Sequence, residues 1–186
     1  MTPELAPVND DHIDAICDLI NYTYLEDKVP MAMTRGEVVD LLNGPHITPS
    51  NDSRVVLAEG RVVGYEVVLF RPSGERQENT FLLGTVDVDH RRNGIGSALL
   101  KWGIARSRER FAEIANELPR IVRAEAYPWQ NDRIALLTAH GLEPTRYYHD
   151  MIRPLETLPR FAPSGFSVAP WTPHHNAVAR LVFHQS

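Results

Sequence analysis

The stretch Thr85-Val86-Asp87-Val88-Asp89-His90-Arg91-Arg92-Asn93-Gly94-Ile95-Gly96-Ser97 decides how this chain folds. It joins a β-rich segment, residues 80–88, to an amphipathic segment that begins at Gly94 and reaches about Phe111. Apolar positions in the second segment recur at helical spacing, so they form one stripe that can dock on a sheet. We therefore predict a strand, a short loop and a helix, with the glycines at the start of the helix.

The start of this predicted helix has the chemistry of a pyrophosphate site. The first N–H groups of a helix have no intrahelical acceptor, and the helix dipole places partial positive charge at the same end. Gly94 and Gly96 lack the Cβ atoms that would hold a phosphate away from those amides. Arg91 and Arg92 add formal charge, and Ser97 can donate a hydrogen bond from its hydroxyl.

Other phosphate-binding motifs fit this loop less well. Leu99 stands where a dinucleotide-binding fingerprint needs its third glycine, and the chain has no Gly-Lys-Ser/Thr triplet for a P-loop. The remaining alternative is structural, with two glycines that only ease the turn from strand to helix.

The composition is that of one acidic globular domain. The chain has 186 residues, 43% of them hydrophobic and 23% charged, and its formal net charge is −5. This charge argues against a nucleic-acid-binding protein. Cys17 is the only cysteine, which favours a reducing compartment, and we find neither a signal peptide nor the roughly 18-residue apolar run of a membrane helix. We expect a cytoplasmic protein with no membrane or nucleic-acid partner and no metal site.

Elsewhere the sequence alternates between strand and helix patterns. Asn9 is a good N-cap for a helix whose apolar face runs to Tyr24, and Thr34 with Glu37 forms a capping box for a second helix. Glu59-Gly60 marks a tight turn between two strands. The other predicted elements are strands at 5–8, 54–58, 62–70, 120–127 and 142–154, and a helix at 132–140. This order predicts an α+β protein, an antiparallel meander followed by a right-handed crossover.

The tail repeats the start of the chain. Val168-Ala169-Pro170-Trp171-Thr172-Pro173-His174-His175 resembles Leu5-Ala6-Pro7-Val8-Asn9-Asp10-Asp11-His12 at an offset of 163 residues, about one domain length. We predict a domain at residues 1–155, a linker at 156–165 and the start of a truncated second repeat at 166–186. The alternative for residues 166–186 is a C-terminal arm that begins with an ordinary strand and helix.

The segment Val86-x-Val88-x-x-Arg91-x-x-Gly94-x-Gly96-x-x-Leu99-Leu100 resembles the signature of the GNAT (Gcn5-related) N-acetyltransferase superfamily. The resemblance implies the GNAT fold, a mixed, mostly antiparallel sheet flanked by helices, with central strands that splay apart to admit a thioester. It also implies acetyl-CoA as cosubstrate, with the strand backbone pairing with the pantetheine arm and the loop amides holding the pyrophosphate. The implied cofactor-binding residues are Val86, Asp87, Val88, Arg91, Arg92, Asn93, Gly94, Ile95, Gly96, Ser97 and Asn131.

The sequence departs from this family where the chemistry takes place. Some members carry a carboxylate on the strand before the loop, where this chain has Phe81-Leu82-Leu83-Gly84, and many carry a tyrosine acid where it has Leu137. Direct attack by an alkyl amine needs a base, because its ammonium form has a pKa of about 10.4. Glu66, Asp87 and Tyr127 are the remaining candidates for catalytic residues.

The resemblance supports one leading function and two alternatives. The leading one is an N-acetyltransferase that transfers acetyl from acetyl-CoA to a primary amine of a small molecule or peptide in a ternary complex. The tandem layout is similar to that of double-GNAT proteins such as mycothiol synthase, which favours, as an alternative, a non-catalytic acyl-CoA-binding half that supports or regulates a partner domain. An antibiotic-modifying acetyltransferase would need an acidic cleft, which Glu66, Asp87 and Asp10-Asp11 could supply. The start of an unpaired second repeat also predicts association into a homodimer.

Overall fold

A mixed five-stranded sheet forms the centre of the computed structural model, which describes residues 3–73, 75–149, 151, 170–176 and 178–179. The strands lie in the order β1-β2-β3-β4-β5, and neighbours are antiparallel except for β4 and β5, which are parallel. This confirms the predicted α+β class and its mostly antiparallel sheet. The strands are β1 (Ala6–Pro7), β2 (Ser53–Ala58), β3 (Arg61–Arg71), β4 (Glu78–Val86) and β5 (Arg120–Ala124).

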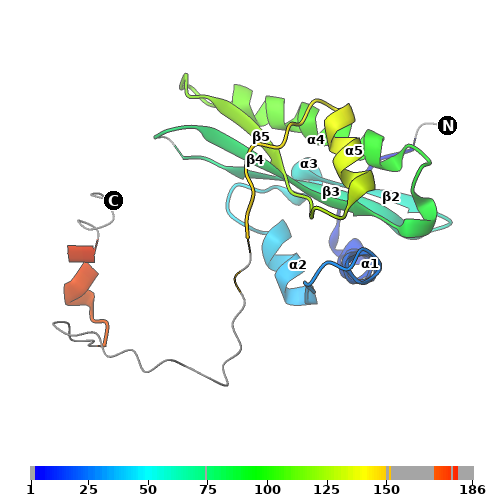
Figure 1. Ribbon diagram of the computed structural model, residues 1–186, viewed down its shortest axis with the longest axis horizontal. Helices are drawn as coiled ribbons and strands as arrows, with labels where there is room; N and C mark the ends of the chain where they lie inside the picture. The colour runs from blue at the N-terminus through cyan, green and yellow to red at the C-terminus, as the bar shows by residue number, and fades with distance from the viewer. Residues whose placement is uncertain (1–2, 74, 150, 152–169, 177, 180–186) are drawn as a thin grey trace. The chain divides into compact units, whose positions relative to one another are not determined.

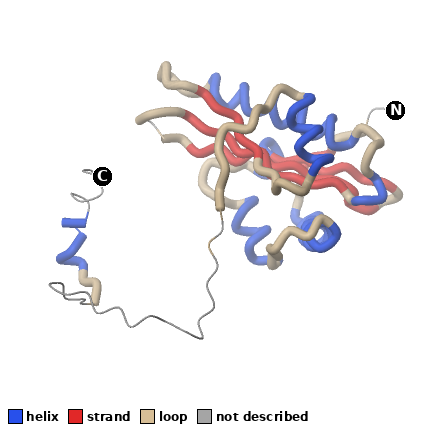
Figure 2. Tube along the Cα trace, viewed as in Figure 1, coloured by secondary structure: helices blue, strands red, loops and turns tan. Residues whose placement is uncertain are grey.

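Helices cover both faces of the sheet (Figure 1). α1 (Ile13–Glu26) and α2 (Arg35–Leu42) lie on one face, and α4 (Ile95–Ala112) and α5 (Asn131–Ala139) lie on the other. α4 is the crossover that joins β4 to its parallel neighbour β5. Figure 2 shows the strands as one layer between these helices. The shorter helices of this part are η1 (Asp10–His12), α3 (Pro49–Asp52) and η2 (Val88–His90).

The two faces of the sheet bury separate apolar cores, because side chains alternate along a strand. On β3, Val67 packs with Ile16 and Ile20 of α1, whereas Val68 packs with Leu100 of α4. Each of these side chains is at most 4% exposed. Burying one branched aliphatic side chain stabilises a fold by about 1.5–3 kcal/mol, so these contacts hold both helix layers on the sheet.

Two local sequence signals act as predicted. Thr34 caps α2, because its Oγ1 accepts from the Glu37 N–H at 3.3 Å while the Glu37 carboxylate accepts from the Thr34 N–H at 2.7 Å. Glu59 and Gly60, with φ of 51° and 77°, make the turn between β2 and β3. Two successive residues with positive φ are what a two-residue hairpin of the favoured twist requires.

Three expectations about strands are wrong. β4 ends at Val86 and not at residue 88, because Asp87 accepts from the Asp89 N–H at 2.9 Å and so caps η2. β5 stops at residue 124, because a turn follows in which the Gln130 N–H donates to the Tyr127 carbonyl at 2.9 Å. The described residues of 142–154, which are 142–149 and 151, contain no strand, and residues 150 and 152–154 lie outside the described part.

The chain divides after residue 145 into two compact units. In the second unit the 3-10 turn η3 (Pro173–His175) follows the N-cap Thr172, whose N–H donates to His175 Nδ1 at 3.1 Å. In the first unit the Asn9 N–H donates to His12 Nδ1 at 3.2 Å. The two turns therefore share a histidine cap at positions that the sequence repeat pairs with each other. The predicted linker, residues 156–165, lies outside the described residues.

Candidate active site

β4 and β5 separate part-way along β4. Their parallel ladder runs from Glu78 paired with Arg120 to Leu82 paired with Ala124 and ends there. On its other side β4 stays paired with β3 as far as Val86. The residues of β4 beyond the last pair, 83–86, therefore make no strand pair on the β5 side, and we call the stretch where the two strands no longer pair the β4–β5 slot. This is the splay that the family resemblance implies.

The slot leads to the N-terminus of α4. Gly94 is the N-cap with φ of 81°, and Arg92 two residues earlier also has a positive φ of 64°. The first helical hydrogen bond is donated by the Ala98 N–H to the Gly94 carbonyl at 3.0 Å. The N–H groups of Ile95, Gly96 and Ser97 precede it and have no intrahelical acceptor. Together with the helix dipole they can bind an anion.

The two glycines of the loop have different roles. A Cβ at Gly94 would meet no atom within 4 Å, so this position needs glycine for its left-handed backbone. A Cβ at Gly96 would lie 3.0 Å from Leu136 Cδ2, so a larger residue here would require the Leu136 side chain of α5 to shift. That both glycines also clear the way for a phosphate stays a prediction. Only at Gly94 does the missing Cβ leave open space.

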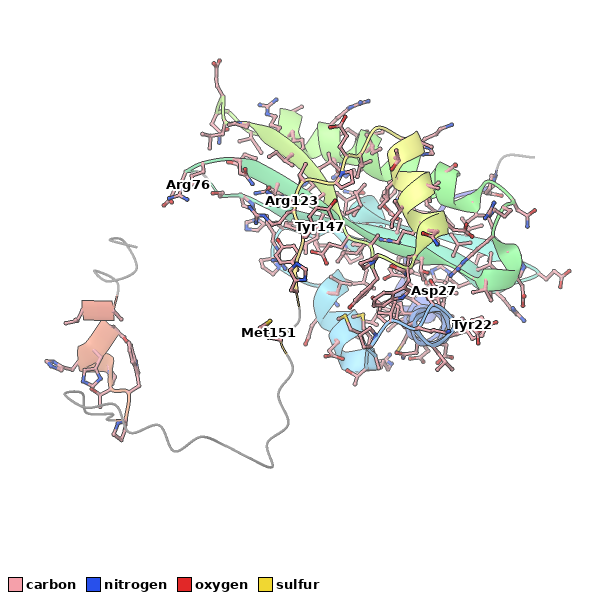
Figure 3. All side chains as sticks on the ribbon, in the orientation of Figure 1. Tyr22, Asp27, Arg76, Arg123, Tyr147 and Met151 are labelled. Carbon is pink, nitrogen blue, oxygen red and sulfur yellow. The ribbon has the colours of Figure 1, made fainter. Side chains whose placement is uncertain are left out.

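The Arg91 guanidinium is engaged inside the protein. Its two terminal nitrogens donate to the two carboxylate oxygens of Asp27 at 2.8 and 2.9 Å, and its Nε donates to the Val86 carbonyl at 3.1 Å. Arg91 thus holds the end of α1 against the end of β4, and its charge is largely neutralised there. Figure 3 labels Asp27 at the end of α1, where the helix approaches the sheet.

The other predicted loop side chains lie at the surface. Arg92 is 78% exposed and pairs with Asp132 at the start of α5. Asn93 donates from its Nδ2 to the His90 carbonyl at 3.3 Å. The exposed Asn131 is the first residue of α5, and its side chain makes no hydrogen bond within the described part of the chain. Arg92 is therefore the loop arginine whose charge solvent or a ligand can reach.

Asp27 also contacts the segment between β5 and α5. Its carboxylate accepts from Gln130 Nε2 at 3.3 Å, and its carbonyl accepts from the Trp129 indole N–H at 2.9 Å. The Trp129 ring stacks on Tyr127 with 4.8 Å between the centroids. The candidate acid Tyr127 is half-buried in this cluster. Three segments far apart in the sequence thus meet at the mouth of the slot, an arrangement that no sequence signal indicated.

Glu66, a candidate base, is buried on β3 beneath α4. It is 7% exposed, and its Oε1 has no hydrogen-bond partner among the described residues. Burial raises the pKa of this carboxyl to about 7, against the opposing effect of the Arg133 charge. Gly84 is its partner across the ladder to β4, and a Cβ there would lie 2.3 Å from Glu66 Oε2. The Glu66 carboxyl therefore lies against the backbone of Gly84, one of the residues of β4 that no longer pair with β5.

Asp87, the third candidate, has structural partners. Besides capping η2, its carboxylate lies 3.2 Å from His90 Nδ1 and 3.9 Å from Arg61. Although burial opposes the effect, these hydrogen bonds and charges lower the pKa of the Asp87 carboxyl. It is a wall of a shallow pocket of about 420 Å³ that also contains Asp11, Asp18 and Arg61 but none of the slot residues 83–86. Of the residues predicted to form an acidic cleft, this pocket therefore contains Asp87 but not Glu66.

Arg133 on α5 bridges the slot. Its Nη1 donates to the carbonyl of Gly84 on β4 at 2.9 Å, and its Nε donates to the carbonyl of Glu125, just after β5, at 2.6 Å. The Arg133 charge also lowers the pKa of Tyr24, although burial raises it more. Sequence analysis overlooked this residue. The available signal was its spacing from Leu137, since residues i and i+4 share one face of a helix.

Two kinds of feature are missing from the described ranges. None of their helices is long and apolar enough to cross a membrane. No three histidine, cysteine, aspartate or glutamate side chains there gather closely enough to hold a metal ion.

Solved structures with this arrangement of strands and helices are acetyltransferases. A GCN5-related N-acetyltransferase from Sphaerobacter thermophilus superposes with a TM-score of 0.67 at 22% identity, over 77% of this chain and 45% of that one. The fold is that of the GCN5-related N-acetyltransferases. Naa50 of Arabidopsis thaliana, in complex with a bisubstrate analogue containing CoA, gives 0.58 at 17% identity over 81% and 92% of the two chains.

The aminoglycoside N-acetyltransferase AAC(6')-Iy in complex with CoA is a further structural neighbour. It gives a TM-score of 0.55 at 14% identity, over 81% of this chain and 93% of that one. This chain spans less than half of the Sphaerobacter protein. Comparison of the sequence with family models and with curated proteins gave no match.

Proposed function

We propose that this protein belongs to the GNAT superfamily and transfers an acetyl group from acetyl-CoA to a primary amine of a small molecule or peptide. The observation that carries the proposal is that β4 stops pairing with β5 after Leu82 and ends close to the first turn of α4, where a Cβ on Gly96 would lie 3.8 Å from Val86 Cγ2. The amides there suit the pyrophosphate, and the slot suits the thioester arm. Structural neighbours crystallised with CoA or a CoA analogue support acetyl-CoA as the cosubstrate.

The proposed reaction is direct attack on the thioester, with Glu66 as the base. A carboxyl with a pKa of about 7 is partly ionised at neutral pH, so it can take a proton from the incoming ammonium through a water molecule. Asp87 is a weaker base because its pKa is lowered, and we assign it no proton transfer. Tyr127 stays a candidate catalytic residue.

Charge reversal at the loop tests the proposed site. Arg92→Glu places negative charge beside the pyrophosphate and should weaken acetyl-CoA binding, measured by calorimetry, about tenfold. Arg108→Glu makes the same charge change at an exposed position of α4 more than three turns away and should have little effect. Equal effects of the two changes, or no binding by the unaltered chain, would contradict the site.

A non-catalytic acyl-CoA-binding domain is the second candidate. Leu137, in the place of the tyrosine acid, packs partly buried against the core of Val68, Leu82 and Leu100, so that position has no acid. Thiol release from acetyl-CoA, followed over a panel of peptide and small-molecule amines, separates the two functions. Release above the rate of hydrolysis supports the enzyme, and binding without release supports the second candidate.

The domain organisation is also a proposal, with residues 1–155 as the CoA-binding domain and 166–186 as the start of a second repeat. The histidine caps at His12 and His175 support it, because they occur at paired positions of the repeat. A chain shortened to residues 1–155 should then bind acetyl-CoA as tightly as the full chain. A loss of binding with the shortened chain still folded would count against this division.

A further inference from the structure

Arg133 lies where a thioester in the slot would react. The last pair of the β4–β5 ladder is Leu82 with Ala124, and the guanidinium bonds to the carbonyls of residues 84 and 125, two residues and one residue beyond that pair. A strand rises about 3.3 Å per residue, so the guanidinium is within a few ångströms of the closed end of the slot. An acyl thioester that fills the slot must therefore contact or displace it.

The Arg133 charge acts on the side chains around the slot. It lowers the pKa values of Tyr24 on α1 and of Tyr65 and Glu66 on β3, in each case against a larger rise from burial. Glu125 and Tyr127 complete the titratable groups close to Tyr24. Burial raises the pKa of Glu66 to about 7, so this carboxyl is only partly ionised near pH 7, whereas the Arg133 guanidinium that acts on it carries a full positive charge.

Arg133 also lies on α5 close to Leu137, the position at which many family members carry the tyrosine acid. Leu137 is apolar, and Arg133 is one turn earlier on the same face of the helix. Arginine stays protonated throughout the ordinary pH range, so it cannot act as a proton donor. It can stabilise an anion instead, and charge-assisted hydrogen bonds to an anion are about twice as strong as neutral ones.

We propose that Arg133 is a further catalytic residue, which stabilises the negative charge that forms on the thioester oxygen and then on the departing sulfur. The inference rests on the proposed acyl transfer. The amine nitrogen bonds to the carbonyl carbon and the C=O electron pair moves to oxygen. That pair returns as the C–S bond breaks, and sulfur leaves with the bonding pair as a thiolate. Before the attack the ammonium gives its first proton to the Glu66 carboxylate, and after it the nitrogen loses a second proton to solvent, from which the thiolate later takes one.

On this account the carbonyls of Gly84 and Glu125 hold the guanidinium in place before the substrate binds. Backbone carbonyls are neutral acceptors, so a guanidinium gains by exchanging them for an oxyanion or a thiolate. The backbone of the entering pantetheine arm can then supply an amide N–H to the Gly84 carbonyl. The exchange makes the contact stronger in the transition state than in the resting protein, which is the condition for catalysis.

Titration of the thiol of bound CoA tests this without knowledge of the acceptor. The full chain is saturated with CoA, and the thiolate is followed by its ultraviolet absorbance against pH. A cation within about 4–6 Å lowers an acid's pKa by about 1–3, so the bound thiol should titrate that far below the free thiol. Arg133→Gln should restore the free value, Arg133→Lys should keep most of the shift, and the control Arg108→Gln should keep all of it.

Turnover gives a second measurement. Loss of one oxyanion donor costs about 10²–10³ in kcat, and Arg133→Gln should show this loss with a much smaller change in KM. The proposal is overturned if the bound thiol of the unaltered chain titrates like free CoA, or if Arg133→Gln leaves its pKa unchanged. If Arg133→Gln does not fold, Arg133→Met, which also removes the charge, is measured in its place by the same criterion. Failure of the unaltered chain to bind CoA would instead overturn the proposed function itself.

Discussion

Both terminal nitrogens of Arg91 donate hydrogen bonds to the two carboxylate oxygens of Asp27, which lies 64 residues earlier in the chain. The two side chains are only 27% and 20% exposed, and the Asp27 carboxylate also accepts from Gln130. The pair therefore fixes the end of α1 against the loop that precedes α4. Arg91 is therefore a structural brace between the two halves of the candidate site.

Loss of this pair should destabilise the protein. Asp27→Asn removes the charge from a partly buried, bidentate contact, and charge-assisted hydrogen bonds of this kind contribute about 1.5–3 kcal/mol. We expect the free energy of unfolding in urea to fall by about 2 kcal/mol. Asp14→Asn is the matched control, because the Asp14–Arg35 pair is 74% and 62% exposed and should contribute less than about 1 kcal/mol. If the two variants lose the same free energy of unfolding, the structural role of the Asp27–Arg91 pair is contradicted.

The two loop glycines should respond differently to alanine. Gly94→Ala should cost about 1–2 kcal/mol, because an L-residue is strained at a φ of 81°. Gly96→Ala should be unfavourable only while Leu136 is present, because the added Cβ meets that side chain. In a Leu136→Ala background we expect the cost of Gly96→Ala to vanish and that of Gly94→Ala to persist. Thermal unfolding of the single and double variants measures both stability costs. If Gly96→Ala costs the same with and without Leu136→Ala, the packing role of Gly96 is contradicted.

Glu66 should make stability depend on pH. Its folded-state pKa of about 7 exceeds the ordinary value of 4.5, so the folded protein holds this proton more tightly than the unfolded chain does. The contribution of Glu66 to stability is therefore lost as pH rises from about 4.5 to about 7. Glu66→Gln should be more stable than the unaltered protein above pH 7, by up to about 3 kcal/mol, and equally stable near pH 4. A constant difference across this range would contradict the raised pKa.

The same carboxyl should control the rate of acetyl transfer. If Glu66 is the base, kcat/KM should rise with pH through a midpoint near 7, because the ionised carboxylate accepts the proton. Glu66→Gln should lower kcat by about 10²–10⁴, the usual contribution of a general base, and should abolish that midpoint. If kcat/KM of Glu66→Gln still shows a midpoint near pH 7, that midpoint belongs to another group.

The loop and the helix that follows it could be predicted from the sequence because their signals are local. The glycines, the arginines and the apolar stripe of α4 lie within about twenty consecutive residues. The partners of Arg91 and Arg133 could not be predicted, because Asp27 and Gly84 come from other elements, 64 and 49 positions away in the sequence.

Side-chain roles within the loop were harder to predict than its backbone. The sequence pattern assigns Gly94 and Gly96 the same purpose, and the left-handed backbone at Gly94 and the packing of Leu136 against Gly96 distinguish them. Likewise Asp87 was read as part of a strand, although its own side chain caps the turn that ends the strand. Local hydrogen bonds of aspartate compete with strand pairing in just such positions.

The central claim is that an acyl-CoA binds with its pyrophosphate at the N-terminus of α4 and its thioester in the β4–β5 slot. A crystal structure of the chain with acetyl-CoA tests it most directly. We predict that the amides of residues 92–97 contact the pyrophosphate and that the thioester lies between Gly84 and Glu125, with the Arg133 guanidinium turned from their carbonyls toward it. Acetyl-CoA bound elsewhere, or a slot still bridged by Arg133 with the thioester outside it, would contradict the account.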